Sequence, residues 1–100
     1  MLKLLNGKRG LIMGVANDRS IAWGIAKEAY LNGAELAFTF QNDMFFERIQ
    51  KLALSVNSNK IIKCNVENKD EISSVFRTLK DKWGSLDFIV HAIAFSEKDE

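Results

Sequence analysis

The sequence predicts an α/β fold in which parallel β-strands alternate with helices that cover the faces of the sheet. Four short apolar segments recur along the 100 residues, and a helical pattern of apolar residues separates each from the next. The turns between them are short and rich in glycine, asparagine and serine. Hydrophobic residues make up 47% of the chain, which is enough for one globular unit with its own core.

The amino-terminal part is predicted to form a strand, a helix and a second strand. A short apolar run predicts the first strand at residues 8–13. The helix that follows covers residues 20–32, with Ser20 as a suitable N-cap and Gly33 as the residue that ends it. Residues 35–40 are again apolar and form the second strand.

A second helix is predicted after Asn42 or Asp43, since either residue suits an N-cap. A polar turn at residues 57–59 ends this helix, and the third strand covers residues 60–65. The side chains expected on its buried face recur at three-and-four spacing and are Phe46, Ile49, Leu52, Ala53 and Val56.

The third helix carries the clearest start and stop signals. Asn68 with Glu71 three residues later resembles a capping box, and Gly84 ends the helix. The fourth strand covers residues 88–91. The apolar face predicted for this helix consists of Ile72, Val75, Phe76, Leu79 and Trp83.

Repeated strand–helix units with short turns favour parallel strands joined by right-handed crossovers. We therefore predict a Rossmann-like sheet with strand order 3-2-1-4, numbered along the chain, and helices on its faces. Ligands of such open sheets bind beyond the carboxyl ends of the strands. The turns that follow the strands are therefore the segments in which functional residues are expected.

Composition excludes several classes of partner. The 14 basic and 13 acidic side chains nearly cancel, so we expect no nucleic acid and no membrane surface as a partner. Cys64 is the only cysteine and has no metal-ligand spacing to a histidine, so we expect a buried apolar role and no metal site. The apolar runs are far shorter than the roughly 20 residues that span a bilayer, and no signal peptide is evident, so we expect a cytoplasmic protein.

The turn between Gly14 and Gly24 is the first candidate site. A strand that leads through small residues into a helix presents backbone N–H groups to a phosphate. The usual fingerprint has three glycines, of which only the first and last are present here. Ala16 and Ser20 are small enough to let phosphates approach, and the Ser20 hydroxyl adds a donor. The same spacing also suits an ordinary βα loop with an N-cap serine.

The end of the second strand bears on which nucleotide would bind. Enzymes that use NAD often place an acidic residue there for the ribose hydroxyls, whereas enzymes that use NADP place an arginine for the 2′-phosphate. The segment that begins at Gln41 holds no cation, and Asp43 would repel a phosphate. The Gln41 amide can hydrogen-bond to a ribose or adenine edge, so we predict NADH rather than NADPH. A solvated turn residue is the alternative for Gln41.

Two further strand ends are expected at the same edge of the sheet. Asn65 follows the third strand and could read an adenine amino group, while Val66 packs on the adenine ring. Ala92, Ile93 and Ala94 follow the fourth strand and are small or apolar enough to let the backbone approach a cofactor.

Three parts of the sequence carry a family resemblance. The first is Gly-Val-Ala at 14–16 with Ser-Ile-Ala-Trp-Gly-Ile-Ala at 20–26, the second runs from Gly to Gln-Asn-Asp at 33–43, and the third is residues 86–95. They resemble the NADH-dependent enoyl-[acyl-carrier-protein] reductases of bacterial fatty acid synthesis, a divergent branch of the short-chain dehydrogenase/reductase superfamily. The resemblance covers nearly the whole chain, and its first two motifs are specific to this branch.

The resemblance implies roles for individual positions. Asn65 departs from the family pattern, which usually has aspartate there; an amide oxygen still accepts a hydrogen bond but lacks the charge. Ser96 matches a small residue beside the acyl substrate. The remaining matches are to cofactor-binding positions: Gly14, Ser20 and Ile21 at the pyrophosphate, Gln41 at the adenosine, and Val66 and Ile93 at the adenine and the nicotinamide-side ribose.

The reaction that the resemblance implies is hydride transfer from NADH to the β-carbon of an enoyl thioester carried by acyl carrier protein, in a homotetrameric enzyme. The tyrosine and lysine that complete this chemistry in the family have no match, because the only tyrosine, Tyr30, falls in the first helix. We expect no catalytic residue here and place them beyond Glu100. Residues 1–100 are then the amino-terminal part of a single Rossmann domain and are inactive alone.

Two other function classes suit the same fold. One is a non-catalytic nucleotide-binding module, which would bind NADH without turning over a substrate. The other is a methyltransferase that uses S-adenosylmethionine, whose second strand normally ends in an acidic residue. Gln41 argues against the methyltransferase.

Overall fold

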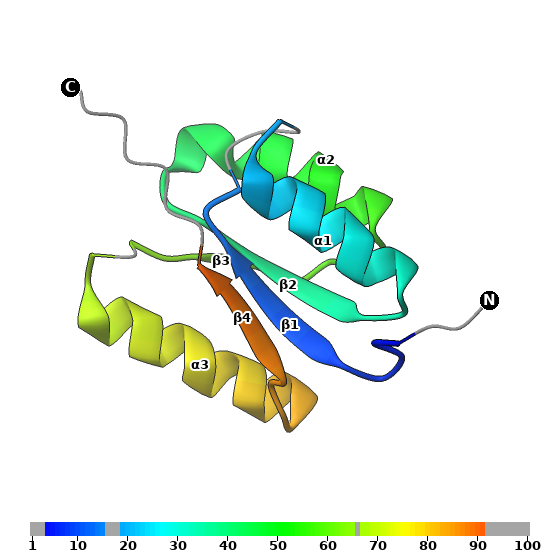
Figure 1. Ribbon diagram of the computed structural model, residues 1–100. Helices are drawn as coiled ribbons and strands as arrows, with labels where there is room; N and C mark the ends of the chain where they lie inside the picture. Colours follow the sequence, from blue (N-terminus) through cyan, green and yellow to red (C-terminus); the bar gives the residue numbers. More distant parts are fainter. Residues whose placement is uncertain (1–3, 16–18, 66, 92–100) are drawn as a thin grey trace.

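The computed structural model of the chain shows a four-stranded parallel sheet with helices on both faces (Figure 1). It describes residues 4–15, 19–65 and 67–91. The strand order is β3-β2-β1-β4, so the predicted order 3-2-1-4 is confirmed. The strands are β1 (Arg9–Met13), β2 (Glu35–Phe40), β3 (Ile61–Lys63) and β4 (Phe88–His91).

The helices form two layers around the sheet. Figure 1 shows α1 (Ile21–Leu31) and α2 (Phe46–Ser55) on one face and α3 (Lys69–Trp83) on the other. A short 3-10 helix, η1 (Asp43–Phe45), leads into α2. Within the described ranges, no helix is both long enough and apolar enough to cross a membrane.

Alternating side chains of the central strands supply a core on each face of the sheet. Leu11 and Met13 of β1 and Ala37 of β2 pack in the cluster that contains the buried residues of α3. Ile12 and Phe38 point the other way and pack with buried residues of α1 and α2. Since β1 and β2 are covered on both faces, their sequences read as continuous apolar runs rather than alternating ones.

The predicted ends of α1 are confirmed. Ser20 has extended backbone angles, and its hydroxyl accepts a hydrogen bond from the backbone N–H of Trp23 at 3.3 Å. Gly33 follows the helix with a φ of +98°, a region that glycine adopts without a steric penalty. The small residues at both ends therefore fix where α1 starts and stops.

The predicted capping box of α3 forms only in part. The Asn68 side-chain oxygen accepts from the backbone N–H groups of Asp70 and Glu71, at 2.9 and 3.1 Å, as a cap should. The Glu71 carboxylate does not return to Asn68; it accepts from the backbone N–H of Asn65 at 2.9 Å. This bond ties the start of α3 to the segment that follows β3.

Two other boundaries differ from the prediction. β3 is shorter than residues 60–65, although the Lys60 carbonyl still accepts from the backbone N–H of Phe38 and the Cys64 N–H donates to the Phe40 carbonyl. The Asn42 side chain caps η1 rather than α2, accepting from the backbone N–H of Met44 at 3.1 Å.

Phe46, predicted on the buried face of its helix, is exposed. It is the first residue of α2, and its ring meets that of Phe40 edge-on, with 5.2 Å between the ring centroids. Phe76 of α3 is likewise exposed rather than buried.

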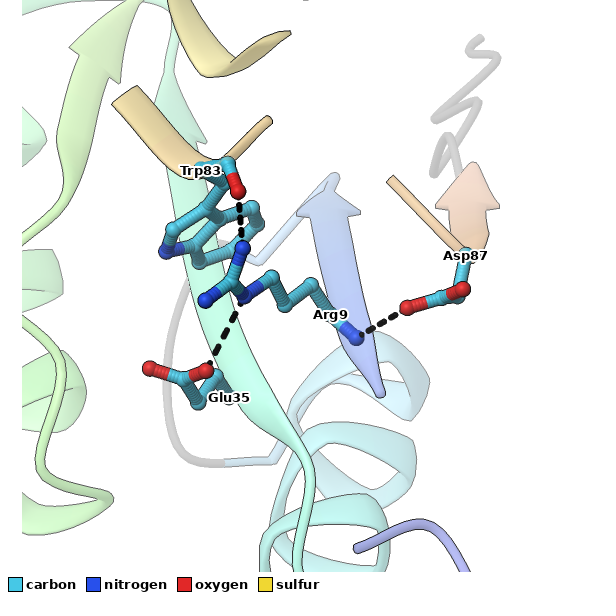
Figure 2. A network of polar contacts seen from close by, with 4 residues as sticks. All are labelled: Arg9, Glu35, Trp83 and Asp87. Atoms are coloured by element: carbon cyan, nitrogen blue, oxygen red, sulfur yellow. Dashed lines mark hydrogen bonds and ion pairs between the residues drawn. The ribbon is translucent and has the colours of Figure 1, made fainter. Parts of the chain in front are cut away.

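A polar network joins β1, β2, the end of α3 and the residue before β4 at the edge of the sheet where the strands begin (Figure 2). Arg9 of β1 forms an ion pair with Glu35 of β2 at 3.0 Å, and its guanidinium donates to the backbone carbonyl of Trp83 at the end of α3. The backbone N–H of Arg9 donates to the Asp87 carboxylate, just before β4, at 2.8 Å. A cation at the carboxyl end of a helix is also favoured by the helix dipole. Arg9 thus connects β1 to β2, to α3 and to the start of β4 at this edge, here called the amino edge.

Gly10 of β1 is required by the packing of its neighbour. It pairs with Phe88 of β4, and a Cβ built at Gly10 would lie 2.1 Å from the Phe88 ring. Gly24 of α1 provides a contrast, because a Cβ built there meets no atom within 4 Å. The two glycines therefore have opposite requirements for space.

We expect Gly10→Ala to lower the free energy of unfolding by about 1–3 kcal/mol, because the new methyl group must displace the Phe88 ring. Gly24→Ala is the control and should raise it by about 1 kcal/mol, because alanine has the higher helix propensity. Thermal unfolding followed by circular dichroism measures both. Equal stability of the two variants would contradict the close packing of Phe88 on β1.

Candidate functional site

The carboxyl ends of all four strands lie along one edge of the sheet, here called the carboxyl edge (Figure 1). The register shows this directly, since Met13 of β1 pairs with His91 of β4 and Phe40 of β2 pairs with Lys63 of β3. The turns that follow these residues are therefore neighbours. This is the edge at which open parallel sheets bind their ligands.

The turn after β1 has a backbone that requires glycine at its first position. Gly14 has a φ of +100°, a backbone conformation that residues with a side chain rarely adopt. The turn ends at Ser20, the N-cap of α1, whose carbonyl accepts a hydrogen bond from the backbone N–H of Gly24 at 3.2 Å. Residues 16–18, including the predicted small residue Ala16, lie outside the described residues. The described ends of the turn thus match the predicted glycine and N-cap serine.

The start of α1 suits an anion. The N–H groups of a first helical turn point out of the helix, and the helix dipole favours negative charge there. No acidic residue lies in the first turn of α1, whereas α3 has Asp70 and Glu71 in its first turn. Ile21, the first residue of α1, leaves 78% of its surface exposed. This helix start therefore combines an exposed apolar side chain with a first turn that holds no acidic residue.

Gln41 and Asn65 stand exposed after β2 and β3. The Asn65 side-chain oxygen already accepts a hydrogen bond from the backbone N–H of Glu67 at 3.0 Å. A carbonyl oxygen has two lone pairs, so one remains for a further donor such as an adenine amino group. The structure therefore leaves the predicted role of Asn65 chemically available.

A cation from the neighbouring strand lies beside the end of β2. Lys63, the last residue of β3, places its Nζ 3.1 Å from the Asp43 carboxylate. The segment after β2 does lack a cation of its own, but the neighbouring strand supplies one. The predicted third strand ran to residue 65 and placed Lys63 inside it, so the position of Lys63 beside the end of β2 becomes clear only from the register of β3 against Phe40.

Three of the predicted site residues, Val66, Ile93 and Ser96, lie outside the described residues. Tyr30 lies near the carboxyl end of α1 and lines a cavity of about 80 Å³ with Lys60 and Trp83. It is therefore remote from the carboxyl edge. Among the residues that the structure describes, no group of histidine, cysteine or acidic side chains is arranged to hold a metal ion.

A groove of about 580 Å³ runs between α1 and β4. Its lining is mainly apolar, and none of the predicted cofactor residues contributes to it. The residues that line it are Leu5, Lys8, Ile25, Glu28, Ala29, Asn32, Asp87, Phe88 and Val90. The groove is thus a separate feature from the carboxyl edge.

The chain is similar to known reductases in sequence and in structure. Residues 14–100 match the family model described as Enoyl-(Acyl carrier protein) reductase. The chain is 55% identical over 97 residues to enoyl-[acyl-carrier-protein] reductase [NADH] 2 of Rhizobium meliloti strain 1021; the match covers 97% of this chain but 36% of that protein.

Solved structures give the same result. The crystal structure of FabI from Candidatus Liberibacter asiaticus superposes with a TM-score of 0.93 and 53% identity, over 100% of this chain and 39% of that one. A reductase from Anaplasma phagocytophilum in complex with NAD gives a TM-score of 0.91 and 44% identity, over 99% of this chain and 38% of that one. The chain therefore spans well under half the length of these relatives.

Cys64 is fully buried after β3, as predicted. Burial, and to a lesser extent the nearby Glu71 carboxylate, raise the pKa of its thiol above its ordinary value. Both effects disfavour the thiolate, which is the species that reacts with alkylating reagents.

We expect iodoacetamide to alkylate Cys64 at least about tenfold more slowly than free cysteine at pH 8, because the thiol is buried and its pKa is raised. The rise of the rate with pH should also be displaced to higher pH. Intact-protein mass spectrometry measures the modified fraction, and denaturation in urea is the control that should restore the ordinary rate. Rapid alkylation of the folded protein would contradict the placement of Cys64.

Proposed function

Because the chain belongs to the enoyl-(acyl carrier protein) reductase family, we propose that it supplies the NADH-binding part of a reductase acting on enoyl thioesters of acyl carrier protein. The observation that best supports the cofactor assignment is the carboxyl edge, where a glycine with a positive φ lies beside a helix whose first turn holds no acidic residue. The relatives described above support NADH as the cofactor, since the name of one includes NADH and another was crystallised with NAD.

The pyrophosphate would lie against the turn after β1. At Gly14 the absence of a side chain lets an oxygen approach the backbone, and the conformation at φ +100° is one that only glycine adopts readily. The N–H groups at the start of α1 and the Ser20 hydroxyl would act as donors. No carboxylate in the first turn of α1 opposes the negative charge.

The adenosine would extend along the carboxyl edge toward β2 and β3. Gln41 offers an amide for the ribose or adenine edge, and the free lone pair of Asn65 can accept from the adenine amino group. Val66 would pack on the adenine ring and Ile93 would contact the nicotinamide-side ribose. Ile21 would cover the pyrophosphate from the start of α1, where its side chain is exposed.

When bound, NADH supplies the hydride that reduces the double bond of the enoyl thioester. The role of these residues is to bind the cofactor and to fix its orientation, with Ser96 beside the acyl group. Tyr30 lies too far from the carboxyl edge to act on substrate. We therefore place the catalytic residues outside the chain and expect the 100 residues alone to be inactive.

We also propose that residues 1–100 are the amino-terminal part of a single Rossmann domain. Two features support this among the residues that the structure describes: β4 is an edge strand that leaves 46% of Ile89 exposed, and the apolar groove between α1 and β4 is open. A further strand beside β4 and a helix over the groove would bury these surfaces. We propose a cytoplasmic location, from the short apolar runs of the sequence, and a homotetrameric assembly, from the family.

We expect the complete product of the gene that encodes this chain to oxidise NADH only when an enoyl thioester is present. The absorbance of NADH at its long-wavelength band, followed with crotonyl and longer thioesters, measures the reaction. The 100-residue chain should give no such signal. If the complete protein bound NADH but oxidised none with any enoyl thioester, a non-catalytic binding module would be the better interpretation.

Gly14→Val should weaken NADH binding to the complete protein by about tenfold or more, because the side chain blocks the approach of phosphate to the backbone. Fluorescence titration with NADH measures the dissociation constant. Gly84→Val is the matched control, since Gly84 also has a positive φ, +80°, but lies at the end of α3 and outside the carboxyl edge. It should lower thermal stability without changing NADH affinity. Unchanged affinity of the Gly14 variant would contradict the assigned phosphate turn.

A further inference from the structure

An ion pair bridges the ends of β2 and β3 beside the proposed adenosine site. The Nζ of Lys63 lies 3.1 Å from Oδ1 of Asp43. We propose that this pair determines specificity for NADH over NADPH, with Asp43 holding Lys63 away from the position of a 2′-phosphate. The inference rests on the proposed NADH-binding function and adds two residues to it.

The backbone fixes both charges close to Gln41. Lys63 is paired with Phe40, the last residue of β2, and the backbone N–H of Cys64 donates to the Phe40 carbonyl at 2.9 Å. Asp43 begins η1, which is held by its Asn42 cap. Gln41 therefore lies between the strand end that pairs with Lys63 and the turn that carries Asp43.

The electrostatic argument follows from the difference between the two cofactors. NADPH carries an additional phosphate on the adenosine ribose, with a charge of about −1.5 to −2 near pH 7. At the end of the second strand, acidic side chains select NAD and a cation selects NADP. This chain has one charge of each sign there, and in contact they nearly cancel. A 2′-phosphate at this position therefore meets Lys63 as a paired cation.

Both partners are exposed, with 55% of the Lys63 side chain and 79% of the Asp43 side chain accessible. Exposed ion pairs contribute little to stability, so replacing either partner should leave the fold intact. The same exposure means that one unpaired charge near a phosphate changes affinity by only about three- to tenfold. The expected change is in cofactor preference and is moderate in size.

The test compares NADPH and NADH affinities of the complete gene product by fluorescence titration at low ionic strength. Asp43→Asn releases Lys63, so the ratio of NADPH to NADH affinity should rise about three- to tenfold. Lys63→Gln leaves the carboxylate unpaired, so the ratio should fall by a similar factor. Both changes should shrink at high salt, because exposed charges are screened.

Asp81→Asn and Lys82→Gln are the matched controls, because they make the same charge changes on exposed positions in the last turn of α3. Their ratios should stay within about twofold of the unsubstituted protein. The inference is overturned if the Asp43 and Lys63 variants shift the ratio in the same direction, or no more than the controls do, while melting temperatures show folded proteins. If the unsubstituted protein binds no NADH, the proposed function fails and this inference fails with it.

Discussion

The parallel pairing of four strands around β1 determines the rest of the structure. Because every strand runs in the same direction, each carboxyl end falls on one edge, and the residues after the strands become neighbours although they are far apart in sequence. β1 lies between β2 and β4 and is buried on both faces. Its residues after Arg9 are buried and carry no polar side chain. The polar side chains that could bind a ligand therefore lie at the ends of the strands.

The two edges of the sheet differ in how their polar groups are used. At the amino edge, the hydrogen bonds and ion pair of Arg9 join β1 to β2, to the end of α3 and to the residue before β4. These groups bind one another and stabilise the arrangement of the elements. At the carboxyl edge, Gln41 and Asn65 are exposed and Gly14 holds an unusual backbone conformation. Groups of that kind are suited to binding a ligand.

The sequence was sufficient for the fold wherever local signals agree. The bounds of β2 and β4 and the strand order were predicted as observed, because apolar runs lie between glycines, caps and polar turns. Local signals failed where a contact between distant segments decides the outcome. The Glu71 carboxylate accepts from the backbone N–H of Asn65 rather than from that of the N-cap residue Asn68. Phe46 packs against the Phe40 ring instead of entering the core.

The residues of the candidate site could likewise be predicted only where a local signal marks them. Gly14 and Ser20 carry a local signal, since a positive φ and an N-cap each restrict the residue type. Lys63 carried none, because its pairing with Asp43 depends on the register between β2 and β3. The spacing of the turn also suits an ordinary βα loop, so the resemblance was needed to assign a nucleotide site, whereas the preference for NADH came from Gln41 and the absence of a cation after it.

The central claim, that the carboxyl edge holds NADH, is tested most directly by a crystal structure of the complete gene product grown with NADH. Electron density for the pyrophosphate is expected against the backbone of Gly14 and the start of α1, with the adenosine beside Gln41 and Asn65. Density for the dinucleotide in the groove between α1 and β4, or at the amino edge near Arg9, would contradict it.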